Sequence, residues 1–166
     1  MILNIKQTQF GAEPEFEIED TATGETLAKC TSLNHISTEI VFAGQNAYTL
    51  SFEPVLQERE GEKNELMYSI SEHNRSVGDL YTAEVCQKKI LFVSVGYDYY
   101  EIQFYGGMYQ LYEIGLGTDR HYLCLYEDGQ TVAIVHKPTE VKSHLDTYTV
   151  YLENAQYRDI ACIAAL

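Results

Sequence analysis

Apolar and polar residues alternate with a period of two along most of this chain, a pattern typical of β-strands with one buried face. In Glu13–Asp20, glutamate occupies every second position up to residue 19, and Phe16 and Ile18 lie between the glutamates. The segments that read as further strands are Glu25–Thr31, Thr38–Ala43, Ala47–Phe52, Leu66–Ile70, Val77–Val85, Ile90–Val95, Tyr97–Tyr105, Met108–Leu116, Tyr122–Tyr126, Thr131–His136 and Tyr148–Leu152. About a dozen short strands at regular spacing indicate a mainly β sandwich or barrel.

The connections between these strands carry ordinary turn residues. Asp128-Gly129 lies between two apolar segments, and Asp-Gly supplies the positive φ that a tight hairpin turn needs. The polar, acidic segment Glu53–Glu65 predicts a long loop. We interpret the glutamates of Glu13–Asp20 as a solvated strand face. Aligned carboxylates on a strand lie roughly 7 Å apart, which is too far for them to share one cation.

The period changes at the C-terminus, where seven apolar residues follow one another from Ile160 to Leu166. Asn154 can cap the start of a helix, so we expect a helix over Ala155–Leu166. A helix that is apolar all round must be buried, and its three alanines keep it thin. The sequence therefore predicts a closed or nearly closed antiparallel β-barrel with this helix inside it, with Ile160, Ile163 and Leu166 buried. A final buried strand is the alternative.

The apolar run is short for a helix that crosses a barrel. Seven residues span about 10 Å at 1.5 Å per residue, which is less than the depth of a barrel. We therefore expect one of two outcomes. Either Leu166 reaches solvent at the far mouth, or the natural chain continues and an apolar cavity remains beside Ile163 and Leu166.

The length and the net charge of the chain disfavour several classes of function. The chain has 166 residues, which is the size of one domain, so we treat residues 1–166 as a single domain. Its net charge of −14 disfavours nucleic-acid partners and anionic membranes. The segment Met1–Lys6 has no basic start followed by a long apolar run, so we expect a cytoplasmic protein. Four scattered cysteines, without a CxxC pair, then predict free thiols: Cys30, Cys86, Cys124 and Cys162.

Motifs for catalysis, cofactors or metals do not emerge from the sequence. His121 and Cys124 have a spacing that suits a metal on a helix, but on a strand residues i and i+3 point to opposite faces. Gly115-Leu-Gly117 resembles the start of a phosphate-binding loop, yet a strand rather than a helix follows it. We therefore expect no catalytic residue, no cofactor and no metal site, and an uncharacterised hydrolase is the less favoured alternative.

Tyrosines are concentrated in the second half of the chain. Tyrosine has a high β-propensity and covers sheet surfaces, and exposed tyrosines also anchor interfaces. The tyrosines that form a possible interaction face for a sugar, peptide or protein are Tyr97, Tyr99, Tyr105, Tyr109 and Tyr112.

Several short segments follow one another in an order that resembles a known family. They are Ile5–Gln7, Phe16–Gly24, Tyr109–Gly117, Tyr122–Tyr126, Val132–Lys137 and Asp146–Tyr151, with Asp159 before the apolar tail. The order is similar to the tubby C-terminal-like domain in its compact bacterial version, related to LURP-one and scramblase domains. This resemblance implies a twelve-stranded closed barrel around a central apolar C-terminal helix, and it supplies no catalytic residue.

The same resemblance also has implications for the binding partners of this chain. Some eukaryotic relatives bind phosphoinositides through basic residues, and scramblases associate with membranes. Here Lys88-Lys89 is the one adjacent pair of cations, which argues against phosphoinositide or membrane binding. We therefore expect a non-enzymatic cytoplasmic binding or scaffold domain. The alternative is an acidic protein-interaction partner such as a bacterial toxin-immunity protein, because complementary charge accelerates association with a basic partner.

Overall fold

The computed structural model describes residues 1–44, 46–59, 62–90, 93–116, 121–137 and 145–166, and for 53–59, 62–67, 82–90, 93–98, 115–116 and 121 it describes the backbone alone. The chain forms twelve strands, a 3₁₀ turn and one α-helix. Their bounds are β1 Ile2–Gln9, β2 Glu15–Asp20, β3 Thr26–Asn34, β4 Ser37–Phe42, β5 Ala47–Arg59, β6 Glu62–Glu72, β7 Arg75–Ile90, β8 Val93–Phe104, β9 Gly107–Leu116, β10 His121–Glu127, β11 Gln130–Lys137, β12 Thr147–Leu152, η1 Ala155–Tyr157 and α1 Arg158–Ala165.

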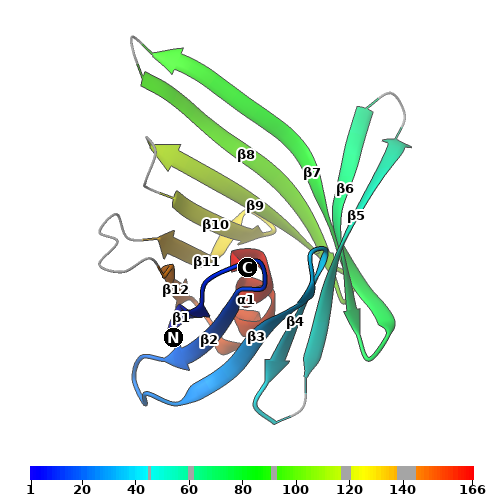
Figure 1. Cartoon of the computed structure of the whole chain (residues 1–166). Coiled ribbons are helices and arrows are strands. Elements are labelled where there is room, and N and C mark those ends of the chain that lie inside the picture. The colour runs from blue at the N-terminus through cyan, green and yellow to red at the C-terminus, as the bar shows by residue number, and fades with distance from the viewer. Residues whose placement is uncertain (45, 60–61, 91–92, 117–120, 138–144) are drawn as a thin grey trace.

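The twelve strands close into one antiparallel barrel (Figure 1). Each strand pairs with its neighbours in the sequence, and β1 closes the ring by pairing with β12, with Leu3 opposite Val150 and Ile5 opposite Tyr148. Every strand therefore has a neighbouring strand on both sides within the ring, and the hairpins β5–β6 and β7–β8 extend beyond their neighbours at one end. The predicted mainly β, closed antiparallel barrel is confirmed.

Connections in such a meander alternate between the two ends of the barrel. One end carries the tight turns after β2, β4, β6, β8 and β10, and we call it the helix end because the chain enters the lumen there from β12. Its turn at Asp128-Gly129 has φ values of 49° and 76°, so the predicted hairpin turn is confirmed. We call the other end, where the long strands β5 to β8 project, the open end (Figure 1).

The C-terminal segment lies inside the barrel as a helix. The Asn154 side chain accepts a hydrogen bond of 3.1 Å from the backbone N–H of Gln156 and so caps the 3₁₀ turn that leads into α1. Ile160, Ala161, Cys162 and Ile163 are all buried, as a helix surrounded by strands requires. The predicted helix is confirmed with Ile160 and Ile163 buried, and the alternative of a final strand is wrong. The predicted burial of Leu166 is also wrong, because Leu166 follows the last turn of α1 and is exposed.

Two predictions about the long strands are wrong. The predicted loop Glu53–Glu65 is a hairpin in which β5 and β6 pair as far as Arg59 and Glu62. The predicted strand Ile90–Val95 is the place where β7 ends and β8 begins, with Ile90 opposite Val93. The first error arises because backbone hydrogen bonds hold a hairpin together whatever its side chains, so polarity alone does not mark a loop. The second arises because an apolar run does not show by itself where a strand ends.

The core consists of the inward-facing residues of almost every strand together with the buried residues of α1. Eight strands enclose a lumen that side chains alone can fill, and twelve enclose a wider one. The helix fills part of that space, but its eight residues are only about 12 Å long. The lumen is therefore filled at the helix end and remains partly open beyond the last turn of α1.

Candidate functional site

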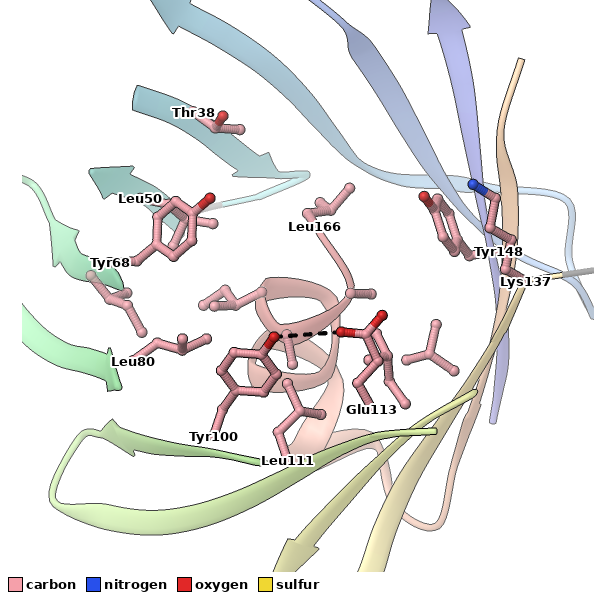
Figure 2. Close-up of a pocket in the computed structure, with 16 residues that line it drawn as sticks. Thr38, Leu50, Tyr68, Leu80, Tyr100, Leu111, Glu113, Lys137, Tyr148 and Leu166 are labelled. Carbon is pink, nitrogen blue, oxygen red and sulfur yellow. Dashed lines mark hydrogen bonds between the residues drawn. The ribbon is translucent and has the colours of Figure 1, made fainter. Parts of the chain in front are cut away.

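A cavity of about 450 Å³ occupies the lumen between the end of α1 and the open end of the barrel (Figure 2). The two features that were expected as alternatives occur together: the cavity lies beside Ile163 and Leu166, and Leu166 is 36% exposed. Its volume falls in the range of about 300–1,000 Å³ that small-molecule sites in proteins occupy. We call it the lumenal pocket.

The lumenal pocket has an apolar floor. The end of α1 contributes Ile163 to Leu166, and the strands contribute the aliphatic residues Leu50, Ile70, Leu80, Leu111, Leu123 and Val135. These residues lie there because alternate residues of every strand point inward, and because α1 stops below them. The floor offers a surface from which an apolar molecule displaces water.

The wall of the lumenal pocket carries its polar groups. They are Thr38, Tyr68, Tyr100, Glu113, Lys137 and Tyr148, from six different strands. The Tyr100 hydroxyl donates a hydrogen bond of 3.5 Å to Oε2 of Glu113 across the β8–β9 pair (Figure 2). An apolar floor with a few polar groups on the wall is the usual composition of a ligand site.

Lys137, the last residue of β11, belongs to a cluster of paired groups with Asp146, which directly precedes β12. Its Nζ lies 2.9 Å from Oδ1 of Asp146 and 5.4 Å from the centre of the Tyr148 ring. Burial disfavours the charged ammonium, but the hydrogen bond to Asp146 and the nearby Tyr148 and Asp146 outweigh it, so the pKa of Lys137 is raised. Gln7 accepts from the backbone N–H of Asp146 at 2.9 Å. Lys137 therefore stays charged and held in place.

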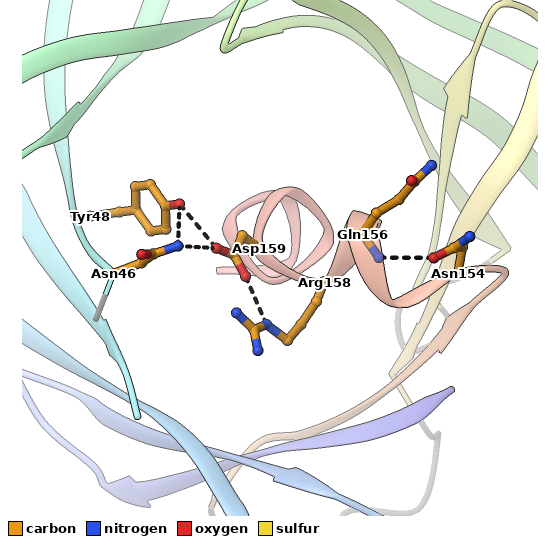
Figure 3. Close-up of polar contacts among 6 residues, drawn as sticks. All are labelled: Asn46, Tyr48, Asn154, Gln156, Arg158 and Asp159. Atoms are coloured by element: carbon orange, nitrogen blue, oxygen red, sulfur yellow. Dashed lines mark hydrogen bonds and ion pairs between the residues drawn. The ribbon is translucent and has the colours of Figure 1, made fainter. Parts of the chain in front are cut away.

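A polar cluster at the helix end fixes α1 against the barrel (Figure 3). Oδ2 of Asp159 accepts hydrogen bonds from the Tyr48 hydroxyl at 2.9 Å and from Nδ2 of Asn46 at 3.1 Å. Oδ1 of Asp159 accepts from Nε of Arg158 at 2.7 Å, and the Arg158 guanidinium lies 4.7 Å from the centre of the Phe42 ring. This cluster joins the first turn of α1 to β4 and β5, and so sets how deep the helix lies in the lumen.

Of the five tyrosines of the predicted interaction face, the four whose side chains the structure describes are not brought together. Tyr99 and Tyr112 contact each other outside the barrel, with ring centres 4.9 Å apart. Tyr105 lies in the β8–β9 turn at the helix end and donates to Glu72, and Tyr109 packs against the core. The side chain of Tyr97 lies outside the described residues. The four described tyrosines therefore do not form one surface.

The strand register instead forms a row across the outside of the barrel, which we call the outer row. Consecutive strands place its members opposite one another, and several are exposed. They are Tyr99, Tyr112, Cys124, Ile134, Tyr151 and Ile2. Only pairing between strands creates this row, so sequence analysis did not find it.

The remaining expectations concern metals, thiols and membranes. Within the part of the chain that the structure describes, no three His, Cys, Asp or Glu residues are grouped as a metal would require. Cys30, Cys124 and Cys162 are free thiols, as predicted, and the side chain of Cys86 lies outside the described residues. Among the described helices, none is long and apolar enough to cross a membrane.

The acidic face of β2 is solvated and partly paired, as expected. Nζ of Lys29 lies 3.0 Å from Oε1 of Glu17, and Lys6 pairs with Glu19. These exposed ion pairs contribute little to stability.

Comparisons with known proteins do not indicate a function for this chain, so the function has to be inferred from the geometry of the site. No family model matches the chain, and neither a curated protein nor a solved structure matches it.

Proposed function

We propose that this chain is a non-enzymatic cytoplasmic binding domain of the tubby-like type that takes a small ligand into its lumenal pocket. The observation that carries the proposal is the 450 Å³ cavity between the end of α1 and the open end of the barrel. A closed barrel of twelve strands around a C-terminal helix is also the arrangement that the sequence resemblance implies, and it supports the family assignment.

The chemistry of the described residues supports binding over catalysis. A catalytic lysine or cysteine needs a lowered pKa to act as a nucleophile. Here the pKa of Lys137 is raised, and burial raises the pKa of the Cys30 and Cys162 thiols to about 12. The polar groups of the pocket wall are suited to holding and orienting a ligand.

The test is to fill the pocket and measure binding of a neutral apolar probe. N-phenyl-1-naphthylamine fluoresces more strongly when it leaves water, so its titration reports occupation of the pocket. We expect saturable binding to the native chain. Ala165→Phe places a ring in the cavity that Ala165 lines and should weaken binding roughly tenfold or more.

The matched control is Ala22→Phe, which adds the same ring to an exposed turn at the helix end. Thermal melting of both variants checks that each one folds. Equal probe binding by Ala165→Phe, Ala22→Phe and the native chain would contradict the proposal, as would a native chain that binds no probe.

A second candidate function is that of an acidic protein-interaction partner, such as a bacterial toxin-immunity protein. The specific observation is the outer row, whose exposed members Ile2, Ile134 and Tyr151 lie on a chain of net charge −14. A basic nuclease encoded beside this gene should associate with the chain, and Tyr151→Glu should weaken the complex. An adjacent gene product that fails to bind at low salt would count against this candidate.

A further inference from the structure

We propose that the lumenal pocket takes an uncharged, largely apolar molecule with one acceptor oxygen, such as a ketone or ester carbonyl, and that Lys137 donates the hydrogen bond that holds this oxygen. This inference rests on the proposed function and specifies the chemical class of its ligand. It follows from the apolar floor of the pocket, from the ionic partner that Lys137 already has, and from the donors of the lysine.

Lys137 supplies a charged hydrogen-bond donor to the pocket. Lys137 and Tyr148 line the side of the pocket that β11 and β12 form, across the barrel from β5 and β6 (Figure 2). An ammonium group has three N–H donors and no acceptor. Nζ of Lys137 lies 2.9 Å from Oδ1 of Asp146 and also interacts with Tyr148, so these described partners account for two of the three donors. A lysine in this state recognises an acceptor atom of the ligand.

The charge of Lys137 is already balanced, which favours a neutral acceptor over an anion. An incoming carboxylate or phosphate would meet the Asp146 carboxylate beside the lysine, and like charges brought together reject a ligand. The Tyr148 hydroxyl donates a further hydrogen bond of 3.4 Å to Oδ2 of Asp146, which holds that carboxylate in place. A neutral oxygen avoids this repulsion. It still accepts from a charged donor, and such a bond is roughly twice as strong as one between neutral groups.

A cationic ligand is disfavoured by the same lysine. Lys137 is the basic side chain among the described residues that line the pocket, and it stays protonated, because its partners outweigh burial and raise its pKa. A second ammonium group has the same charge and has no acceptor for the lysine. The Glu113 carboxylate already accepts a hydrogen bond from Tyr100, and we assign it no contact with the ligand.

The floor and the volume set the apolar part of the ligand. Ile163, Ala164 and Ala165 of the last turn of α1 offer an apolar surface, and a charged group that leaves water for such a surface loses its hydration. A cavity of 450 Å³ equals the volume of about 15 liquid water molecules at about 30 Å³ each. A ligand of roughly that many non-hydrogen atoms therefore fits, with its apolar body on α1 and its oxygen at Lys137.

The experiment compares four probes that share ten carbons and a phenyl ring: 4-phenyl-2-butanone, butylbenzene, 4-phenylbutanoate and 4-phenylbutylamine. Each probe competes with N-phenyl-1-naphthylamine for the native chain near neutral pH. We expect the neutral ketone to bind roughly tenfold or more tightly than either charged probe. Lys137→Met removes the donor and keeps an unbranched side chain, so it should weaken ketone binding roughly tenfold and leave butylbenzene binding unchanged.

The matched control is Lys29→Met, which makes the same change on the outer face of β3, where Lys29 pairs with Glu17. It should leave the binding of all four probes unchanged, and thermal melting checks that both variants fold. A second measurement needs no variant: the NMR resonance of the ketone's carbonyl carbon, labelled with carbon-13, in the native complex. We expect it to stay near its frequency in water, because the oxygen accepts a hydrogen bond, whereas in an apolar cavity without a donor it moves to lower frequency.

The possible failures are distinguishable. The inference is wrong, while the proposed function stands, if N-phenyl-1-naphthylamine binds but a charged probe binds as tightly as the ketone. The same holds if folded Lys137→Met keeps full ketone binding, if Lys29→Met weakens it equally, or if the carbonyl resonance moves to lower frequency. If N-phenyl-1-naphthylamine itself does not bind in the pocket, the proposed function fails with the inference.

Discussion

Removing the Asp159 carboxylate tests how the helix is held in the barrel. Asp159→Ala deletes the acceptor of the hydrogen bonds from Tyr48 and Asn46 and of the ion pair with Arg158. Tyr48 is 1% exposed, so its hydroxyl cannot turn to bulk water for a new partner. The bond of 3.3 Å between Asn46 and Tyr48 remains and compensates in part.

The expected magnitude follows from these contacts. A hydrogen bond to a charged group contributes about 1.5–3 kcal/mol. After the change Asn46 still donates to the Tyr48 oxygen, while the Tyr48 hydroxyl loses Asp159 as its acceptor. The ion pair with Arg158 adds only about 0–1 kcal/mol, because the Arg158 side chain is 32% exposed. We expect a loss of about 3 kcal/mol, which is a large share of the roughly 5–15 kcal/mol that stabilises a typical domain.

Denaturant unfolding followed by far-UV circular dichroism measures this loss. For a chain of this size, about 3 kcal/mol corresponds to a decrease in Tm of roughly 6–12 °C. The control is Glu39→Ala, which removes a carboxylate from the outer side of β4, since Thr38 and Ile40 point inward. A double-mutant cycle with Tyr48→Phe should give a coupling energy of about 1 kcal/mol or more. If Asp159→Ala costs no more than Glu39→Ala, the cluster does not anchor the helix.

Four further predictions follow from burial and charge. Ile160→Asp should cost several kcal/mol, because it places a carboxylate among buried apolar groups; an unchanged Tm would contradict burial. Iodoacetamide at about pH 8 should label half-buried Cys124 before Cys30 and Cys162, because burial raises the pKa of those two thiols to about 12. Mass spectrometry reads the labelling, and rapid labelling of Cys162 in the native chain would contradict this expectation. Burial raises the pKa of Tyr109 from 10.0 to about 12. The stability that results from this shift is present below pH 10.0 and is lost as pH rises towards 12. Denaturant unfolding below and above that range should therefore show a smaller free energy of unfolding at high pH, and Tyr109→Phe should reduce the difference. The chain should not co-sediment with anionic vesicles at about 0.15 M salt, because its net charge is −14; saturable micromolar binding would overturn this.

The sequence by itself determined the class of the fold and the position of the helix. Period-two alternation assigns strands because a strand at the surface of a core must bury every second residue. The apolar run from Ile160 to Leu166 predicts a buried helix for the same reason, since no face of it is suited to water. The shortness of that run even indicated where space would remain, because helix length follows directly from the number of residues.

Only the tertiary structure decided which residues meet. Glu113 and Tyr100 lie on neighbouring strands, and Lys137 and Asp146 lie on either side of a long connection, so no local pattern links them to one cavity. Asp159 accepts hydrogen bonds from Tyr48 and Asn46, which lie more than a hundred positions away in the sequence. The hairpin of β5 and β6 forms despite its polar sequence, because backbone groups pair independently of side chains. Local periodicity reports whether a residue is buried, and strand register together with barrel closure decides what lies beside it.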